Sequence, residues 1–291
     1  MSVVIAAKNE ELHVLQAVTS IIEQHDVSLE LIFVDDGSSD STLQIVEKFS
    51  LRAPNLKLFR NPGQGKCSAF NYGVSLASGR YVAIFAGDDV MPQGSLSARM
   101  NALNGENPEL PVVGLCKLKT LSEDPKEDGH IVPKAKGRGV YSGVSYLFNR
   151  PALSRAFPVP EDFPNEDTFL ELAVLHLGWK QVHSDVIGCF WRVHAGNSMN
   201  FRFPFDEFNR KLTRRMEVLT VFQRQFELEL ASDQKRLISA KIDLEANRAK
   251  GDIIGILMAK VPIKDRLRAL AYANRAFYEF RRKLNKFLSG I

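Results

Sequence analysis

The chain of 291 residues lacks the signals of several common protein classes. Its three cysteines are scattered and lack metal-like spacing, so we expect reduced thiols and a cytoplasmic protein. No apolar run is long enough to span a bilayer, because the stretch 253–258 is short and flanked by charges. No internal repeat is evident, and the apolar N-terminal run has no basic leader, so we expect no signal peptide. The sequence therefore favours an ordinary globular protein.

Charge is unevenly distributed along the chain. The net charge is only +4, with 45% hydrophobic and 25% charged residues, as in ordinary globular proteins. Residues 260–291, however, contain nine Lys and Arg against two acidic residues, a net charge of +7 that leaves −3 for the rest. We expect any partner of the basic residues to bind this tail. The tail has no recognised nucleic-acid-binding motif, so no nucleic-acid partner is expected.

The first part of the chain alternates between apolar runs and amphipathic segments. Strands are predicted at 2–7, 29–34, 56–59 and 81–86, and helices at 10–23, 42–49 and 66–77. Strands that alternate with helices form a doubly wound sheet, whose ligand binds beyond the carboxyl ends of the strands. The sequence therefore predicts a Rossmann-like α/β fold with a site at that edge.

Polar clusters follow three of these predicted strands. They are Lys8-Asn9-Glu10, Asp35-Asp36-Gly37 and Asp88-Asp89, and the glycine-rich turn before Lys66 lies between the second and the third. Adjacent carboxylates repel each other unless a cation lies between them, and hard oxygen ligands suit Mg²⁺ or Mn²⁺. Such an ion leaves coordination positions for phosphates, so we predict a nucleotide diphosphate as the ligand. The alternative is that Asp88 and Asp89 only begin a solvated turn.

The pattern changes further along the chain. The elements predicted next are a strand at 112–118, a polar loop at 122–139, a helix at 168–177 and strands at 181–184 and 188–193. Beyond Pro204 the sequence predicts long helices at 207–230, 233–249 and 264–288. We therefore predict a boundary near residue 200.

Six short motifs occur in order over about the first 200 residues. They are Ser2-Val-Val-Ile with Asn9-Glu10, Val34-Asp-Asp-Gly-Ser-Ser-Asp40, Gly65-Lys66 with Asn71 and Gly73, Asp88-Asp89 with Pro92, Glu166-Asp167 with Gly178, and Arg192-Val-His194 with Asn197-Ser198. In these motifs the chain resembles the family 2 glycosyltransferases, which are inverting enzymes of the GT-A fold. The resemblance implies a doubly wound mixed sheet with a nucleotide-binding half at 1–92 and an acceptor-binding half at 93–200. Residues 201–291 would form a helical extension.

The resemblance also implies roles for single residues. The residues implied to bind the nucleotide sugar, with a UDP-sugar favoured, are Ala7, Lys8, Glu10, Asp35, Asp36, Lys66 and Asp88. The residues implied to bind Mn²⁺ or Mg²⁺ are Asp88, Asp89 and His194, although His194 could equally be structural. The sequence departs from the family at two places. Ala86 replaces the first acid of the usual Asp-x-Asp, and Lys8 stands where an aromatic ring would stack on the base.

Asp167 matches the catalytic base of the family. Inversion requires an acceptor hydroxyl to attack opposite the leaving diphosphate, so one carboxylate must take the hydroxyl proton. Glu166 and Arg192 are expected to contact the acceptor or the diphosphate. The alternative for Glu166 and Asp167 is that they only cap the helix that follows them.

Residues 264–288 have the pattern of a basic amphipathic helix, for which an anionic membrane surface and a second subunit are both open as partners. The sequence as a whole predicts a metal-dependent inverting glycosyltransferase. Its acceptor would be a saccharide or a lipid-linked saccharide, in surface polysaccharide or glycolipid synthesis, in the cytoplasm or peripherally on the cytosolic face of the inner membrane. The alternatives are a sugar-nucleotide-binding module without catalysis and a polyprenyl-phosphate sugar transferase.

Overall fold

The computed structural model describes residues 1–25, 27–194 and 203–288, with only the backbone described for 284–288. The chain divides into two compact units, Met1–Val193 and His194–Ile291. The elements of the first unit are β1 (Ser2–Ala7), α1 (Val14–Ile22), β2 (Glu30–Asp35), α2 (Thr42–Ser50), β3 (Leu56–Arg60), α3 (Lys66–Leu76), β4 (Tyr81–Ala86), α4 (Ser95–Asn101), β5 (Val112–Leu121), β6 (Ile131–Val132), the 3₁₀ turn η1 (Gly143–Ser145), β7 (Tyr146–Asn149), α5 (Arg150–Ala156), α6 (Asp167–His176) and β8 (Lys180–Arg192).

The strands of the first unit form one mixed sheet. Their order is β3-β2-β1-β4-β7-β5-β6, and β8 pairs with β5. The pairs among β1, β2, β3 and β4 are parallel, whereas β7 is antiparallel to both β4 and β5. In this register Ala7 lies beside Asp35, and Ala6 lies beside Ala86. The predicted doubly wound mixed sheet is therefore confirmed, and three strands end side by side at one edge.

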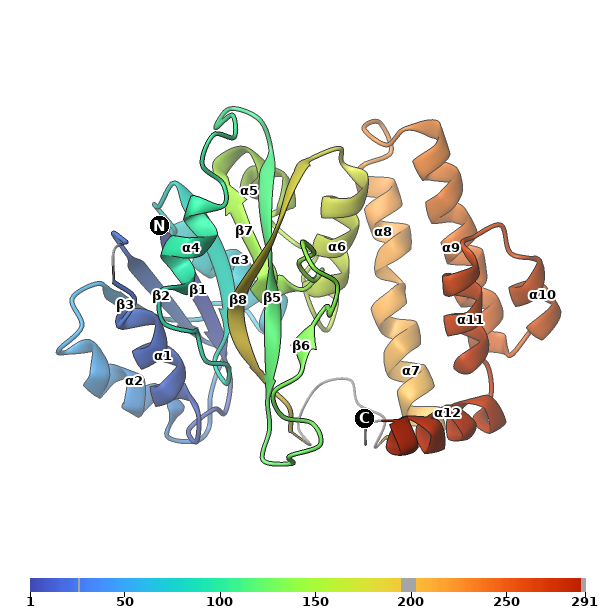
Figure 1. Ribbon diagram of the computed structural model, residues 1–291, viewed down its shortest axis with the longest axis horizontal. Coiled ribbons are helices and arrows are strands. Elements are labelled where there is room, and N and C mark those ends of the chain that lie inside the picture. Colours follow the sequence, from blue (N-terminus) through green and yellow to red (C-terminus); the bar gives the residue numbers. More distant parts are fainter. Residues whose placement is uncertain (26, 195–202, 289–291) are drawn as a thin grey trace. The chain divides into compact units, whose positions relative to one another are not determined.

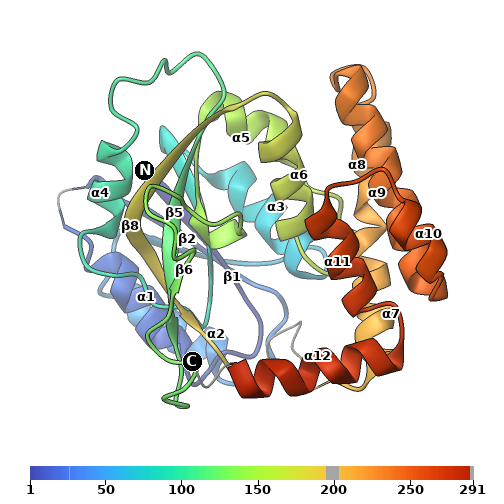
Figure 2. The ribbon, with the colours of Figure 1, turned by 45° about the vertical axis from the view of Figure 1, so that its right-hand side comes forward.

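Helices cover both faces of this sheet. Figures 1 and 2 show α1, α2 and α4 on one face, with α3, α5 and α6 on the other. Val3 and Ile5 of β1 pack in one buried cluster with Val18 of α1. On the opposite face α3 approaches so closely that a Cβ on Gly73 would lie 2.4 Å from Val4 Cγ1. Because β1 is buried on both sides, its sequence is a continuous apolar run rather than an alternating one.

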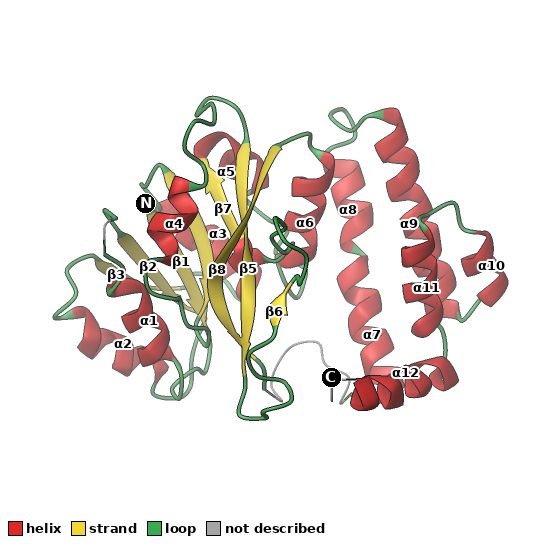
Figure 3. Cartoon of the chain, in the orientation of Figure 1, coloured by secondary structure: helices red, strands yellow, loops and turns green. Residues whose placement is uncertain are grey.

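Some elements of the first unit differ from the sequence prediction. Helix α1 begins at Val14 and not near residue 10, so Leu12 is 84% exposed in the preceding turn. The two strands predicted at 181–184 and 188–193 are one strand, β8, which runs along β5 in Figure 3. Its pairing shifts register around Lys117, because β8 carries extra residues between His183 and Ile187. An irregular pairing of this kind interrupts the apolar pattern without ending the strand.

The second unit is helical in its described residues. Its helices are α7 (Phe205–Met216), α8 (Val218–Gln225), α9 (Ser232–Lys250), α10 (Ile253–Met258), α11 (Ile263–Ala271) and α12 (Arg275–Leu288). The prediction of one helix at 264–288 is wrong, because α12 restarts where Asn274 Oδ1 accepts a hydrogen bond from Phe277 N at 3.0 Å. The helix predicted at 207–230 is likewise divided into α7 and α8. Among the described helices, none combines the length and the apolar character that crossing a bilayer requires.

Candidate active site

The loops after β1 and β2 are joined by hydrogen bonds at the carboxyl edge of the sheet. Asp36 N donates to Ala7 O at 2.8 Å, and Ser39 N donates to Asn9 Oδ1 at 2.8 Å. Asn9 has a φ of 58°, in the left-handed region that asparagine tolerates better than most residues. The predicted donor residue Lys8, next to it, is exposed. These two loops therefore form one wall of the candidate site.

Asp35 and Asp36 have different surroundings. Asp35 is buried, and its Oδ2 accepts a hydrogen bond from Ser38 N at 3.1 Å. Asp36 is half-buried, and its Oδ1 accepts hydrogen bonds from Asn61 Nδ2 at 2.7 Å and from Gly65 N at 2.9 Å. Asp35 thus supports its own turn, whereas Asp36 connects this turn to the residue that precedes α3.

Lys66 is the first residue of α3, and three of the predicted site acids raise the pKa of its ammonium group. Its Nζ lies 3.1 Å from Glu166 Oε1. Burial alone would lower the pKa of the Lys66 ammonium, but the charges of Glu166, Asp167 and Asp88 hold it above its ordinary value. These acids come from α6 and from the end of β4, so Lys66 marks the point at which distant segments converge.

Glu166 and Asp167 lie at the start of α6. Glu166 is 2% exposed, and burial together with the neighbouring Asp167 raises the pKa of its carboxyl, while Lys66 opposes this shift. Asp167 is half-buried, and its Oδ1 accepts a hydrogen bond from Gly143 N at 2.6 Å. A Cβ on Gly143 would lie 2.7 Å from that oxygen, so only glycine permits this approach. Gly143 could not be predicted from the sequence, because its role depends on a contact with a residue 24 positions further along the chain.

Asp88 and Asp89 also differ in burial. Asp89 is 2% exposed, and its Oδ1 accepts a hydrogen bond from Arg192 N at 2.8 Å. Burial and the charge of Asp88 raise the pKa of Asp89 to about 7, despite hydrogen bonds from Arg192 N and the Cys189 side chain. Asp88 is half-buried and remains accessible at the edge of the sheet. Of these two predicted metal ligands, Asp88 is therefore the more accessible.

Arg192 holds the turn that carries these two acids. Its Nε donates to Asp88 O at 2.7 Å, and its NH2 group donates to Gln16 Oε1 at 2.7 Å. The expected contact of Arg192 with the acceptor or the diphosphate stays a prediction, and its contact with Gln16 was not predicted from the sequence. The guanidinium group connects β8 to α1 and to the end of β4.

Glu10 completes a crowded group of acids. Burial, followed by the charges of Asp88, Asp40 and Asp89, raises the pKa of Glu10 to about 7. The loop after β4 packs tightly here, since a Cβ on Gly87 would lie 2.6 Å from Ala7 Cβ. Close carboxylates of this kind repel one another, and a bound cation would relieve that repulsion.

The described residues contain no complete metal site. Within residues 1–25, 27–194 and 203–288, no group of three or more His, Cys, Asp and Glu side chains is arranged to hold a metal ion. An ion that also binds substrate phosphates needs only one or two protein carboxylates. The carboxylate of Asp88, with that of Glu10 nearby, fits this requirement. His194 begins the second unit, so its predicted metal contact stays a prediction.

Comparison with known proteins finds a family match within the first unit. Residues 2–137 match the family model described as Glycosyl transferase family 2. This region belongs to family 2. The family 2 region contains the turns with Asp36 and Asp88 and the start of α3, but not Asp167. The family predicted from the motifs is thus confirmed.

One curated relative and two solved structures illustrate the similarity. The minor teichoic acid biosynthesis protein GgaB of Bacillus subtilis is 30% identical over 117 residues, which cover 39% of this chain and 13% of GgaB. S. aureus TarS 1–349 in complex with UDP-GlcNAc matches with a TM-score of 0.64 and 19% identity, covering 97% of this chain and 91% of that one. Mannosyltransferase PcManGT from Pyrobaculum calidifontis, in complex with GDP-Man and Mn²⁺, matches with a TM-score of 0.61 and 16% identity. This match covers 99% of this chain and 85% of the PcManGT chain.

These matches establish the fold of this chain. At identities below 20% the two structures support the GT-A architecture with a helical C-terminal region, as predicted from the sequence. The chain spans less than half the length of the curated relatives it matches.

Proposed function

We propose that this chain transfers a sugar from a nucleotide donor to a hydroxyl group of a saccharide or a lipid-linked saccharide, with inversion at the anomeric carbon. Its family membership supports the reaction type, and its similarity to a teichoic acid biosynthesis protein supports a role in polysaccharide or glycolipid synthesis. The ligand named for TarS supports a UDP-sugar as donor, whereas the ligand named for PcManGT makes a GDP-sugar the alternative to test.

The donor would bind along the carboxyl edge of β1, β2 and β4. We assign the nucleobase to the wall formed by Ala7, Lys8 and Asp36, with Asp35 supporting the turn. The diphosphate would lie near Lys66, where the ammonium group and the N-terminus of α3 both favour an anion. Because Asp36 also accepts a hydrogen bond from Gly65 N, a base bound at Asp36 would help to fix the start of α3.

Asp88 would hold a divalent cation, Mn²⁺ or Mg²⁺, together with the diphosphate. Such an ion, when bound, neutralises charge that develops on the leaving diphosphate. The crowding of Glu10, Asp88 and Asp89 supports this assignment, because their mutual repulsion is compensated when a cation binds. Asp89 would act through its hydrogen bond to Arg192 N, which keeps Asp88 in position.

Asp167 would act as the general base. The acceptor oxygen forms a bond to the anomeric carbon as the bond to the diphosphate oxygen breaks, and its electron pair leaves with the diphosphate. The acceptor proton passes to the Asp167 carboxylate, which Gly143 N orients from one side. Glu166 would hold Lys66 through the 3.1 Å ion pair and so keep a cation between the base and the donor.

The observation that carries this proposal is the position of Lys66. Its ammonium group forms an ion pair with Glu166, and the charges of Asp167 and Asp88 raise its pKa. We would test it by calorimetry and thermal shift with UDP-, GDP- and dTDP-sugars, with and without Mn²⁺. A ligand that binds only the folded state raises the melting temperature, so the true donor should do so in a manganese-dependent way. Release of the nucleoside diphosphate from the same donor would then report catalysis.

Lys66→Met is the informative variant, and Lys48→Met on the exposed side of α2 is its matched control. We expect Lys66→Met to weaken donor binding about tenfold and Lys48→Met to leave it unchanged. Binding of a donor without any release of nucleoside diphosphate would favour a binding module without catalysis. Failure of every donor to bind in the presence of Mn²⁺ would exclude the proposed function.

A further inference from the structure

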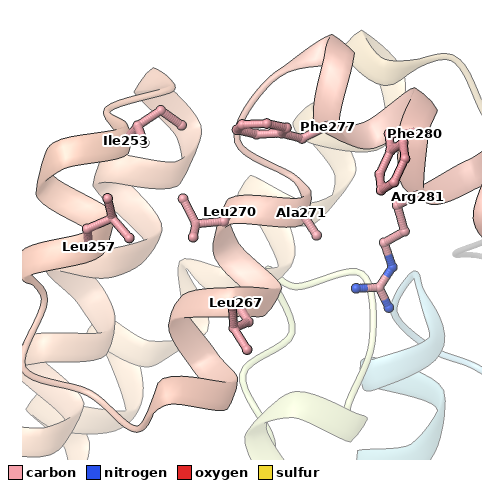
Figure 4. Close-up of a pocket in the computed structure, with 8 residues that line it drawn as sticks. All are labelled: Ile253, Leu257, Leu267, Leu270, Ala271, Phe277, Phe280 and Arg281. Atoms are coloured by element: carbon pink, nitrogen blue, oxygen red, sulfur yellow. The ribbon is translucent and has the colours of Figure 1, made fainter.

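The second unit has an apolar groove that the proposed reaction does not use. It lies among α10, α11 and α12, has a volume of about 460 Å³, and is lined by Ile253, Leu257, Leu267, Leu270, Ala271, Phe277, Phe280 and Arg281. Figure 4 shows Leu270 of α11 pointing toward Ile253 and Leu257 of α10. The groove is therefore assembled from three short helices and not from one continuous tail.

Exposed apolar side chains also lie next to groove residues in the sequence of α10 and α11. Ile254, Met258 and Ile263 are 71%, 77% and 63% exposed, and Leu267 and Phe280 at the groove are 60% and 67% exposed. A contiguous exposed apolar patch on a soluble protein marks a surface that binds something. We call this patch, together with the groove, the α10–α12 surface.

The charges around the α10–α12 surface are mostly of one sign. Residues 253–283 contain eight Lys and Arg against two acidic residues. Both acids already face a basic side chain, since Asp265 lies 3.8 Å from Lys241 and Glu279 lies 2.7 Å from Arg282. The remaining charge is positive, so the partner of this surface should be negative.

We infer that the α10–α12 surface docks on an anionic lipid bilayer. Helices that combine exposed Leu, Ile and Phe side chains with Lys and Arg lie in the bilayer interface, with the apolar groups below the headgroups and the cations among them. Phe280 and Leu267 would enter the headgroup boundary, and exposed Lys264 and Arg268 would contact lipid phosphates.

Charge favours this partner over a second copy of the chain. In a twofold symmetric dimer the same patch faces itself, so the basic residues of one copy would oppose those of the other. Like charges brought face to face cost free energy, and nothing acidic on this surface compensates them among the described residues. An anionic lipid surface meets the apolar and the basic groups at once.

The test is co-sedimentation of the full chain with vesicles of phosphatidylcholine alone and of phosphatidylcholine mixed with phosphatidylglycerol. We expect binding to the anionic vesicles only, and weaker binding as the salt concentration rises. Lys264→Glu with Arg268→Glu should weaken binding by more than about 30-fold, since each basic residue lost near such a surface contributes about fivefold and the new carboxylates also repel anionic lipid. Leu267→Asp with Phe280→Asp should weaken it as well.

The matched control lies in the second unit but outside the α10–α12 surface. Arg224→Glu with Leu228→Asp makes the same kinds of change at exposed positions, and it should bind like the wild type. Equal binding to neutral vesicles, no binding to either kind, or wild-type binding by the Leu267 and Phe280 variant would overturn the inference. So would a dimer that Leu267→Asp dissociates while vesicles bind nothing. Melting temperatures confirm that each variant is folded, and the salt dependence of the wild type tests the inference without any variant.

Discussion

The two ends of the same parallel strands use acidic residues in opposite ways. At the amino end, Glu30 begins β2, and its carboxylate accepts hydrogen bonds from Lys57 Nζ at 2.8 Å, from Ser78 N at 2.9 Å and from Ser2 Oγ. Burial alone would raise the pKa of Glu30, but these partners lower it to about 2. This acid is surrounded by donors and stabilises the junction of three segments.

At the carboxyl end, acids face other acids. Burial and neighbouring carboxylates raise the pKa of both Glu10 and Asp89 to about 7. Asp35 Oδ1 is buried there without a hydrogen-bond partner among the described residues. The repulsion costs stability, and the structure retains it where a cation and a diphosphate would bind. The comparison therefore separates acids that stabilise the sheet from acids that we propose bind a ligand.

Replacing the proposed base should give the largest effect. Asp167→Asn keeps the shape of the side chain and can still accept the hydrogen bond from Gly143 N, but it cannot take a proton. We expect transfer to fall by about a thousandfold, within the range for loss of a general base, with little change in donor binding. Initial rates of nucleoside diphosphate release give the measurement. Asp162→Asn, an exposed acid just before α6, is the control, and full activity of Asp167→Asn would refute the assignment.

The next largest effect should distinguish the roles of two neighbouring acids at the carboxyl end of the strands, Asp88 and Asp89. Asp88→Ala should lower kcat/KM by about a hundredfold and remove the manganese dependence of donor binding, because the proposed metal ligand is lost. Its melting temperature should not fall, since the variant relieves repulsion with Glu10 and Asp89. Activity and thermal unfolding are measured on the same preparation.

Asp89→Ala should show the reverse pattern. It leaves Arg192 N without its buried acceptor, so we expect a loss of about 1 to 3 kcal/mol in the free energy of unfolding. Donor binding by the folded fraction should stay manganese-dependent. If Asp89→Ala abolished the manganese dependence and Asp88→Ala did not, the proposed roles of the two acids would be exchanged.

The sequence predicted the sheet well because local periodicity determines its strands. Strand β1 was predicted with its observed bounds, and the acids at the ends of β2 and β4 followed from strand order alone. The contacts between Gly143 and Asp167 and between Arg192 and Gln16 could not be predicted, since each joins segments whose distance depends on the whole fold. The break before α12 was missed for a local reason. The amphipathic pattern of 264–288 continues through Asn274, although its side chain caps a new helix.

The smallest effect should come from the amino end of the strands and should change stability alone. Glu30→Gln removes a carboxylate whose pKa is about 2 in the folded protein against an ordinary value of 4.5. Since the folded pKa is the lower one, its stabilising contribution is present above pH 4.5 and is lost as the pH falls through about 2. We expect the variant to lose about 2 kcal/mol in the free energy of unfolding at neutral pH. That difference should shrink as the pH falls.

Denaturant unfolding at a series of pH values measures this difference, and Glu47→Gln on the exposed side of α2 is the matched control. Activity of the folded Glu30→Gln variant should equal that of the wild type, because none of the partners of Glu30 belongs to the candidate active site. A stability difference that does not depend on pH would mean that packing, and not charge, accounts for the contribution of Glu30. A loss of activity at full stability would mean that the two ends of the strands are coupled, and the separation drawn between them would fail.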